Sequence, residues 1–313
     1  MSKKARGNIM LLMTAMIWGL AFVAQSDGMN YVGPFTYNAV RTLIGGVVLL
    51  PVIALLRIIP DKTPDSAPKA PLKTTVTGGI VCGVVFFIAG MLQQIGITMT
   101  TAGKAGFVTA LYIVIVPMIS FIIFRKTTLK VWICCAVAVA GFYFLCINEN
   151  FSISVGDLLV LACALFFAIH IMVIDHFNAK NVNCTAMACI QFFTAGLLML
   201  VCMFIFEHPD IDSLLSAWLP ILYGGVISCG VAYTLQIFGQ RYTDPTVAPL
   251  LLSLESVFAA VSGWLILDEQ LSFKELIGCI LVFIAVILAQ IKVKSRKKTG
   301  NEQNQPILSE ESA

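Results

Sequence analysis

Charged residues are scarce in this sequence, and their scarcity sets the class of protein. Only 12% of the 313 residues are Asp, Glu, Lys or Arg, whereas 58% are hydrophobic, and the mean hydropathy is +0.91. Soluble domains carry about 25% charged residues. The composition therefore excludes an ordinary soluble domain and indicates a protein that crosses a lipid bilayer several times.

The sequence also lacks the motifs of metal sites and of enzymes. Its three histidines and ten cysteines form no CxxC or other zinc-ligand spacing, and HExxH, GxSxG, Walker and paired acidic motifs are missing. We therefore expect no enzyme activity, no catalytic residue, no metal and no cofactor. The cysteines are interpreted as small apolar packing residues, and no nucleic-acid partner is expected.

Long apolar runs take the place of these motifs. They are continuous, unlike the alternating segments of a membrane barrel, and each is near the ~20 residues that cross ~30 Å of hydrocarbon. The first run is too long for a signal peptide and has no good cleavage site. The sequence thus predicts an all-α polytopic membrane protein with ten transmembrane helices, at residues 7–26, 34–57, 74–98, 101–124, 130–147, 156–175, 183–206, 216–240, 244–267 and 273–292.

The basic residues predict the orientation of these helices. If the N-terminus is cytoplasmic, 17 of the 20 Lys and Arg residues fall on the cytoplasmic side, two fall outside, and Arg41 lies within a span. An excess of Lys and Arg marks cytoplasmic loops. We therefore expect both termini to be cytoplasmic, with residues 1–6 as a short N-terminus and residues 293–313 as a polar, disordered tail.

The sequence contains an internal repeat. At an offset of 143, eight of the 33 positions from Leu92 to Phe124 are identical, including Gln93/Gln236, which is more than the apolar composition would give by chance. The repeat extends to two sets of five helices, at 7–147 and 155–292. Because five is odd, the two copies must insert with opposite topology. Inverted repeats are typical of secondary transporters, which bind substrate near the membrane midplane.

A lone carboxylate, Glu255, lies within the second copy of the repeat. It follows Asp244 by 11 residues, which places it about 16 Å into the membrane at 1.5 Å per residue. A charge there costs roughly 2.5–3.5 kcal/mol on insertion scales. Three interpretations stay open: Glu255 binds a cationic substrate group, exchanges a proton, or is a structural group within the bundle. The aligned position in the first copy is Tyr112, so the acid breaks the symmetry of the repeat.

Other polar residues within the apolar runs are also candidates. Arg41 lies about 10 Å below the outer surface, where it pairs with a substrate carboxylate, pairs with Glu255, or snorkels to the interface. His170 is a proton relay or, as we favour, a hydrogen-bonded packing residue. Trp18 offers a stacking face to a cavity or packs in the interior.

These residues are expected to face protein or a wet cavity, because polar side chains avoid lipid. The candidate substrate-binding residues are Trp18, Arg41, Gln93, Tyr112, His170, Gln236 and Glu255. The predicted helices at 130–147 and 273–292 have almost no polar side chains. They are expected to face lipid or a second copy of the chain, so a homodimer stays open.

Several stretches resemble the two repeats of EamA-type transporters in the drug/metabolite transporter superfamily. The first repeat carries Trp18–Phe22, Arg41, Gln93–Gly96, Thr100–Gly103 and Thr109–Leu111, and the second carries Leu254-Glu255, Phe258–Ala260, Leu267–Glu269 and Leu271. The resemblance covers about residues 8–290. The chain departs from the family pattern at Phe124-Arg125, where a Gly-Glu pair is usual, and at Ser256, where a proline is common.

The resemblance implies ten helices, cytoplasmic termini, a bacterial-type plasma membrane, and alternating access for amino acids, related metabolites or drugs. Together with the residues, it predicts a secondary transporter for a small polar or amphipathic metabolite, with export as the favoured direction and with proton coupling through Glu255. The alternative is a membrane sensor or scaffold that transports nothing. The sequence does not identify the substrate.

Overall fold

The protein is all-helical in its computed structural model, which describes residues 2–58, 70–124, 129–146, 153–243 and 248–290. The predicted tail at 293–313 lies outside the described residues. The helices are α1 (Lys3–Gly28), α2 (Pro34–Ile58), α3 (Leu72–Ile97), α4 (Ala102–Thr109), α5 (Tyr112–Phe124), α6 (Leu129–Cys146), α7 (Val155–Asn178), α8 (Cys184–Phe206), α9 (Ile211–Ser216), α10 (Trp218–Leu222), the π-helix η1 (Tyr223–Ala232), α11 (Tyr233–Tyr242), α12 (Ala248–Leu267) and α13 (Phe273–Gln290).

Six of the described helical segments are long and apolar enough to cross a membrane. They are α1, α2, α3, α7, α8 and the continuous segment Trp218–Gln240, and shorter apolar helices lie at Ala102–Val116, Trp132–Phe144 and Leu251–Leu267. Lipid cannot satisfy backbone polar groups, so spanning segments of this kind are helical. The chain is a multi-pass membrane protein. Its grouping into ten spans and two inverted repeats remains a prediction.

The fourth predicted helix is broken. In place of one helix at 101–124 the structure has α4 and α5, which are separated by a turn at Ala110 and Leu111. The turn is tight, because the N–H of Leu111 donates to the carbonyl oxygen of Val108 at 3.2 Å. The apolar run continues through the turn. The hydropathy pattern therefore predicts the length of this segment but does not predict that the helix is interrupted.

The eighth predicted helix is also irregular. The sequence predicts one helix at 216–240, but the structure has α10, then ten residues of π-helix, then α11. A π-helix is wider than an α-helix, is rare, and is frequently found at functional sites. Here η1 carries the buried residues Ser228 and Cys229 beside the centre of the molecule.

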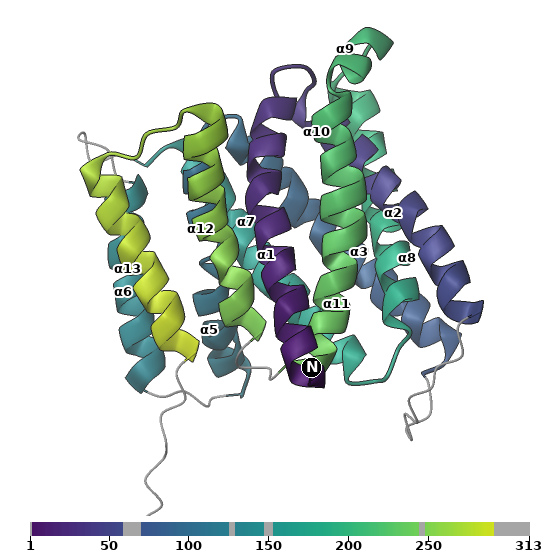
Figure 1. Cartoon of the computed structure of the whole chain (residues 1–313), viewed down its shortest axis with the longest axis horizontal. Helices are drawn as coiled ribbons and strands as arrows, with labels where there is room; N and C mark the ends of the chain where they lie inside the picture. The colour runs from purple at the N-terminus through teal and green to yellow at the C-terminus, as the bar shows by residue number, and fades with distance from the viewer. Residues whose placement is uncertain (1, 59–69, 125–128, 147–152, 244–247, 291–313) are drawn as a thin grey trace, which may run out of the picture.

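The helices form a broad bundle (Figure 1). The pair α6 and α13 makes one edge of the view and the pair α2 and α8 the other, with α1, α3, α7, α11 and α12 between them. We call the face at the top of Figure 1, where α1 ends and α2 begins, the upper face, and the face where α1 begins the lower face.

Pairs of glycines allow the central helices to approach closely at both faces. Near the lower face, a Cβ on Gly7 of α1 would lie 3.0 Å from the carbonyl oxygen of Gly239 in α11. Near the upper face, a Cβ on Gly156 of α7 would lie 2.9 Å from the carbonyl oxygen of Gly96 in α3. Small residues at crossings are typical of membrane helices, which gain stability from close packing.

Candidate functional site

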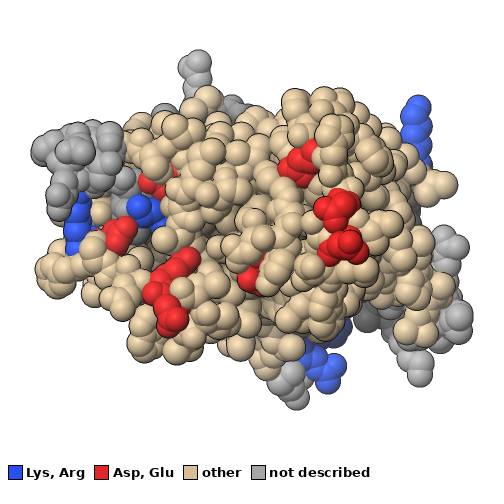
Figure 2. All heavy atoms as spheres, turned by 90° about the horizontal axis from the view of Figure 1, so that it is seen from above, with Lys and Arg blue, Asp and Glu red and all other residues tan. Residues whose placement is uncertain are grey.

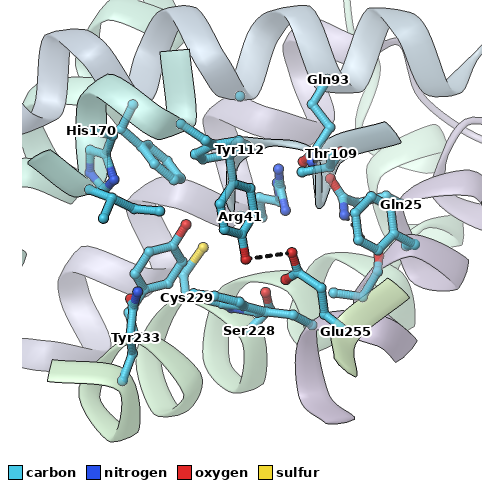
Figure 3. A pocket seen from close by; sticks show the side chains of 18 residues that line it. Gln25, Arg41, Gln93, Thr109, Tyr112, His170, Ser228, Cys229, Tyr233 and Glu255 are labelled. Carbon is cyan, nitrogen blue, oxygen red and sulfur yellow. Dashed lines mark hydrogen bonds between the residues drawn. The ribbon is translucent and has the colours of Figure 1, made fainter. Parts of the chain in front are cut away.

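A cavity lies among the central helices, and side chains from both halves of the chain point into it (Figure 3). The space open to the centre of a water molecule is about 70 Å³. One water needs roughly 10–15 Å³ by this measure, so the cavity has room for several. Its lining comes from α1, α2, α3, α4, α5, α7, η1, α11 and α12.

All seven candidate residues predicted from the sequence lie in the wall of this cavity. They are Trp18 on α1, Arg41 on α2, Gln93 on α3, Tyr112 on α5, His170 on α7, Gln236 on α11 and Glu255 on α12. The structure therefore brings together residues from seven helices. Their role in binding a substrate remains a prediction.

Glu255 is paired with Tyr112. The Tyr112 hydroxyl donates a hydrogen bond to Oε1 of Glu255 at 2.9 Å (Figure 3), and both side chains are buried. The two residues are 143 positions apart, which is the offset of the repeat. Among the described residues, no cation lies within 4.0 Å of the Glu255 carboxylate. The acid thus meets its own counterpart in the other repeat, not a basic partner.

Arg41 is held by its own helix. Its Nε donates to Oδ1 of Asn38 at 2.8 Å, and its Cζ lies 5.3 Å from the centre of the Tyr37 ring. Asn38 in turn donates from Nδ2 to the carbonyl oxygen of Gly90 on α3 at 2.8 Å. Arg41 is 5% exposed and lines the cavity, so it does not snorkel, and it does not form an ion pair with Glu255.

His170 has both a hydrogen bond and aromatic neighbours. Its Nε2 lies 3.0 Å from Oε1 of Gln191 on α8, and its ring is 5.8 Å from the ring of Phe86. The favoured interpretation, a hydrogen-bonded packing histidine, agrees with these contacts. Because His170 also lines the cavity, the structure leaves its ring within reach of a bound solute.

Three amide side chains add polar groups to the cavity wall. Gln93 donates from Nε2 to the hydroxyl of Thr109 at 3.2 Å. The Oε1 atoms of Gln25 and Gln236 find no hydrogen-bond donor within the described residues. Buried polar atoms without a partner are uncommon and call for an explanation. A water or a solute donor in the cavity would supply one.

An aromatic cluster forms the apolar part of the wall. The ring of Tyr233 lies 4.8 Å from Trp18 and 5.7 Å from Phe86, and Phe86 lies 6.2 Å from Phe167. All four residues line the cavity. A cavity with charged groups on some sides and aromatic rings on another is chemically suited to a small amphipathic molecule.

Sequence reasoning missed part of this lining. Gln25, Thr109 and Tyr233 are polar residues within apolar runs, so the sequence predicts that they face protein or a wet cavity, but it does not place them among the substrate-binding candidates. Phe86 and Cys229 carry no such signal, because aromatic and thiol side chains in an apolar run look like packing residues. Within the described residues, no cluster of His, Cys, Asp or Glu could hold a metal ion.

Two carboxylates join the halves of the chain at the upper face. Glu207, just after α8, accepts from the backbone N–H groups of Phe35 and Thr36 at 3.0 and 2.7 Å. Glu269, just after α12, accepts from the N–H groups of Ala102 and Gly103 at 2.7 and 3.0 Å. Each carboxylate therefore sits at the positive end of a helix in the other half.

A basic residue adds a third connection on this face, where acidic side chains predominate (Figure 2). Lys104 of α4 lies 3.8 Å from Asp157 of α7 and 3.4 Å from Glu275 of α13. Figure 2 shows acidic side chains distributed over the upper face, with few basic ones among them. The cavity thus lies beneath a face that is held together by carboxylates.

Comparison with known proteins identifies the family of this chain. The model of the EamA-like transporter family matches residues 5–147 and 154–290. An uncharacterized transporter of Archaeoglobus fulgidus is 30% identical over 292 residues, which cover 93% of this chain and 88% of that protein. The uncharacterized transporter YoaV of Bacillus subtilis is 24% identical over 92% of this chain and 97% of its own length.

A solved structure has the same fold. A protein crystal structure superposes with a TM-score of 0.65 over 91% of this chain and 96% of its own, at 18% sequence identity. At this identity the likeness supports the fold alone. The family match covers nearly the whole described chain in two copies, and the chain belongs to the EamA-like transporter family. Its general function is therefore transport across a membrane.

Proposed function

We propose that this protein is a secondary transporter that carries a small polar or amphipathic metabolite, such as an amino acid or a related compound, across the plasma membrane by alternating access. Export is the direction we favour. The observation that carries the proposal is the cavity within the membrane-spanning bundle, which combines Arg41, Glu255 and an aromatic wall. A protein that served only as a scaffold would have no need of such a cavity, and flux measurements distinguish a transporter from a sensor.

We infer further that the chain consists of two inverted repeats of five helices. Support comes from matched contacts in the two halves. The crossing of Gly7 with Gly239 near the lower face corresponds in the repeat to the crossing of Gly156 with Gly96 near the upper face. In the same way, α1 of the first half packs against α12 of the second. Its counterpart α7 in the second half packs against α4 and α5 of the first. Related contacts at opposite faces are what an inverted repeat requires.

The orientation is part of the same proposal. With both termini in the cytoplasm, the acidic upper face lies outside and the lower face lies inside, as the excess of Lys and Arg in the lower loops favours. Export then means that a solute enters the cavity from the lower face and leaves at the upper face. Fusing a reporter enzyme that is active only outside the cell to each terminus should give inactive fusions.

We propose that Glu255 couples transport to protons. It is the acid within the cavity wall, and Tyr112 is its hydrogen-bond partner. Replacing Glu255 with Gln keeps the size and the acceptor for Tyr112 but removes the exchangeable proton. In proteoliposomes, flux driven by a pH gradient should then fall to the rate measured without one. If E255Q is normally expressed and its flux has unchanged pH dependence, the coupling role is wrong.

The transport proposal itself is tested by flux. Metabolites are compared between cells that lack and cells that overproduce the protein, and the compounds that differ are then offered to proteoliposomes. Accumulation outside the cells indicates export, and depletion of the medium indicates import. Correctly folded protein that moves none of these compounds would favour the alternative, a membrane sensor or scaffold.

A further inference from the structure

Arg41 carries a buried cation whose terminal nitrogens face the cavity. The side chain is 5% exposed, and only its Nε is bound, by Oδ1 of Asn38. Within the described residues, its two terminal nitrogens have no acceptor, and no carboxylate lies within 4.0 Å. Removing a charged group from water is costly unless it is paired. The guanidinium therefore has hydrogen-bonding capacity directed at whatever occupies the cavity.

The surroundings of Arg41 fix the direction in which it points. Asn38 is fully buried, and because its Nδ2 donates to the carbonyl oxygen of Gly90, its Oδ1 must face Arg41. The Tyr37 ring lies beside the guanidinium, and its hydroxyl donates to the carbonyl oxygen of Pro220 at 3.0 Å. The guanidinium is thus held at Nε by Asn38 and on one side by the Tyr37 ring, which leaves its terminal nitrogens available to a ligand.

The π-helix η1 closes the other flank. A Cβ on Gly224, the second residue of η1, would lie 3.1 Å from Cδ of Arg41 and 2.9 Å from the Tyr37 hydroxyl. A glycine at this position therefore lets the backbone pass against the Arg41 side chain. One turn further on, Ser228 and Cys229 of η1 line the cavity. Arg41 thus lies against η1 on one side and is held through Asn38, which is bonded to α3, on the other.

The chemistry of the site selects a carboxylate as the ligand of Arg41. The terminal nitrogens of a guanidinium form a planar fork that matches the two oxygens of a carboxylate. A doubly charged phosphate fits less well, because the same cavity holds Glu255 and supplies Arg41 as its basic residue among the lining side chains. A solute with one carboxylate and one cationic group satisfies both charged residues at once.

We propose that Arg41 is the receptor for the carboxylate of a zwitterionic solute, and that Asn38 is the positioning residue that aims it. This inference rests on the proposed function and adds to it the chemical group that the site recognises. The alternative in which Arg41 serves as the partner of Glu255 has no support from the geometry, since the two do not form an ion pair. Glu255 then faces the cationic end of the solute.

The test compares acids with their amides. Purified full-length protein in lipid nanodiscs is titrated at about pH 6 with leucine, methionine and phenylalanine and with the amide of each, which at this pH keeps the ammonium group and the side chain but loses the carboxylate. We expect the acids to bind about 10- to 100-fold more tightly than the amides, as for hydrogen bonds to charged groups. In Arg41→Gln this ratio should fall to about one.

Two variants of Asn38 separate positioning from folding. Asn38→Asp keeps the acceptor for Arg41, loses the donor to the Gly90 carbonyl oxygen and adds a charge that pairs with the guanidinium, so acid binding should weaken about 10- to 100-fold while amide binding is kept. Asn38→Ala should lower the ratio of acid to amide affinity. Thr42→Val is the matched control, because Thr42 is fully buried one turn along α2 and donates to Met199, outside the cavity. In Thr42→Val the ratio of acid to amide affinity should not change.

Each outcome decides for or against the inference. Wild-type protein that binds none of the acids, or binds acids and amides equally, overturns it, and so does an Asn38→Asp variant with the wild-type ratio. These results leave the proposed transport intact, because another solute can still cross proteoliposomes. Conversely, acids that bind with the expected ratio but never cross would leave the carboxylate site standing and contradict transport.

Discussion

The contact between Tyr112 and Glu255 explains at the residue scale why the repeat is not symmetric. A residue can touch its own counterpart in the other repeat only near the axis that would relate the two copies. Two glutamates there would bring like charges together, which is unfavourable inside a membrane. One tyrosine and one glutamate make a donor and an acceptor, and the hydrogen bond of 2.9 Å is the result.

Removing the Tyr112 hydroxyl should destabilise the protein through Glu255. Tyr112→Phe keeps the ring and loses the hydrogen bond, so we expect a loss of about 0.5–2 kcal/mol, the range for hydrogen bonds between membrane helices. In a Glu255→Gln background the loss should be smaller, because the acceptor is no longer a carboxylate. Unfolding in mild detergent measures both, and equal losses in the two backgrounds would mean that the pair is not coupled.

Much of the cavity lining is predictable from single residues. Polar side chains within apolar runs are expensive in lipid, and this rule predicts that Arg41, His170 and Glu255 face protein or a wet cavity, whereas the structure brings them into one cavity. It does not distinguish Phe86 or Cys229 from packing residues. It also cannot reveal that Asn38, and not a carboxylate, holds Arg41, because pairing depends on the rotation of each helix, which hydropathy does not report.

At the element scale, helix lengths are predictable and helix irregularities are not. The predicted ends of α2, α8 and α13 fall within two residues of the observed ones. The turn at Ala110 and Leu111 has no Pro or Gly to mark it, so the apolar run reads as continuous. Both irregular elements border the cavity: Thr109 and Tyr112 flank the turn, and η1 carries Ser228. Interrupted helices are typical of transporter binding sites.

The crossing of α1 and α12 should depend on Gly19. A Cβ there would meet Cβ of Phe258 and lie 2.9 Å from the backbone nitrogen of Ala259, and backbone atoms cannot move aside. We expect Gly19→Ala to lower the unfolding free energy by about 1–3 kcal/mol, as overpacking usually does. Thermal unfolding in detergent would measure the loss.

Gly90→Ala is the matched control for this crossing. The nearest atom to its added Cβ is the terminal methyl group of Met199 at 3.1 Å, which belongs to a flexible side chain. Since Ala also favours the helix by about 1 kcal/mol over Gly, this variant should be neutral or slightly stabilised. A Gly19→Ala protein as stable as Gly90→Ala would show that α1 and α12 can separate at little cost.

At the scale of the whole molecule, two carboxylates tie the halves together at the upper face. Glu207 and Glu269 each follow a helix of the second half and accept from the first turn of a helix in the first half. If alternating access opens this face, both sets of hydrogen bonds must break. The two carboxylates should therefore favour the arrangement in which the upper face is closed.

Cys229 offers a native reporter of that opening, because it lines the cavity and is 1% exposed. Glu207→Ala and Glu269→Ala should each raise the rate at which a water-soluble maleimide labels Cys229 from the upper side. If each carboxylate contributes ~1 kcal/mol at its helix N-terminus, the rate should increase about fivefold. Mass spectrometry of the Cys229 peptide gives the rate, and Cys229→Ser gives the background.

Asp210→Ala is the control that distinguishes the loss of hydrogen bonds between the halves from the loss of a surface charge. Asp210 belongs to the same acidic face, and hydrogen bonds from the Ser213 backbone and hydroxyl hold its pKa below its usual range, so it carries a negative charge on that face. Those bonds stay within α9, however, and join nothing across the halves. Its removal should leave Cys229 labelling unchanged. If Asp210→Ala accelerates labelling as much as Glu269→Ala does, the effect is one of surface potential, and the carboxylate ties do not govern the closed state.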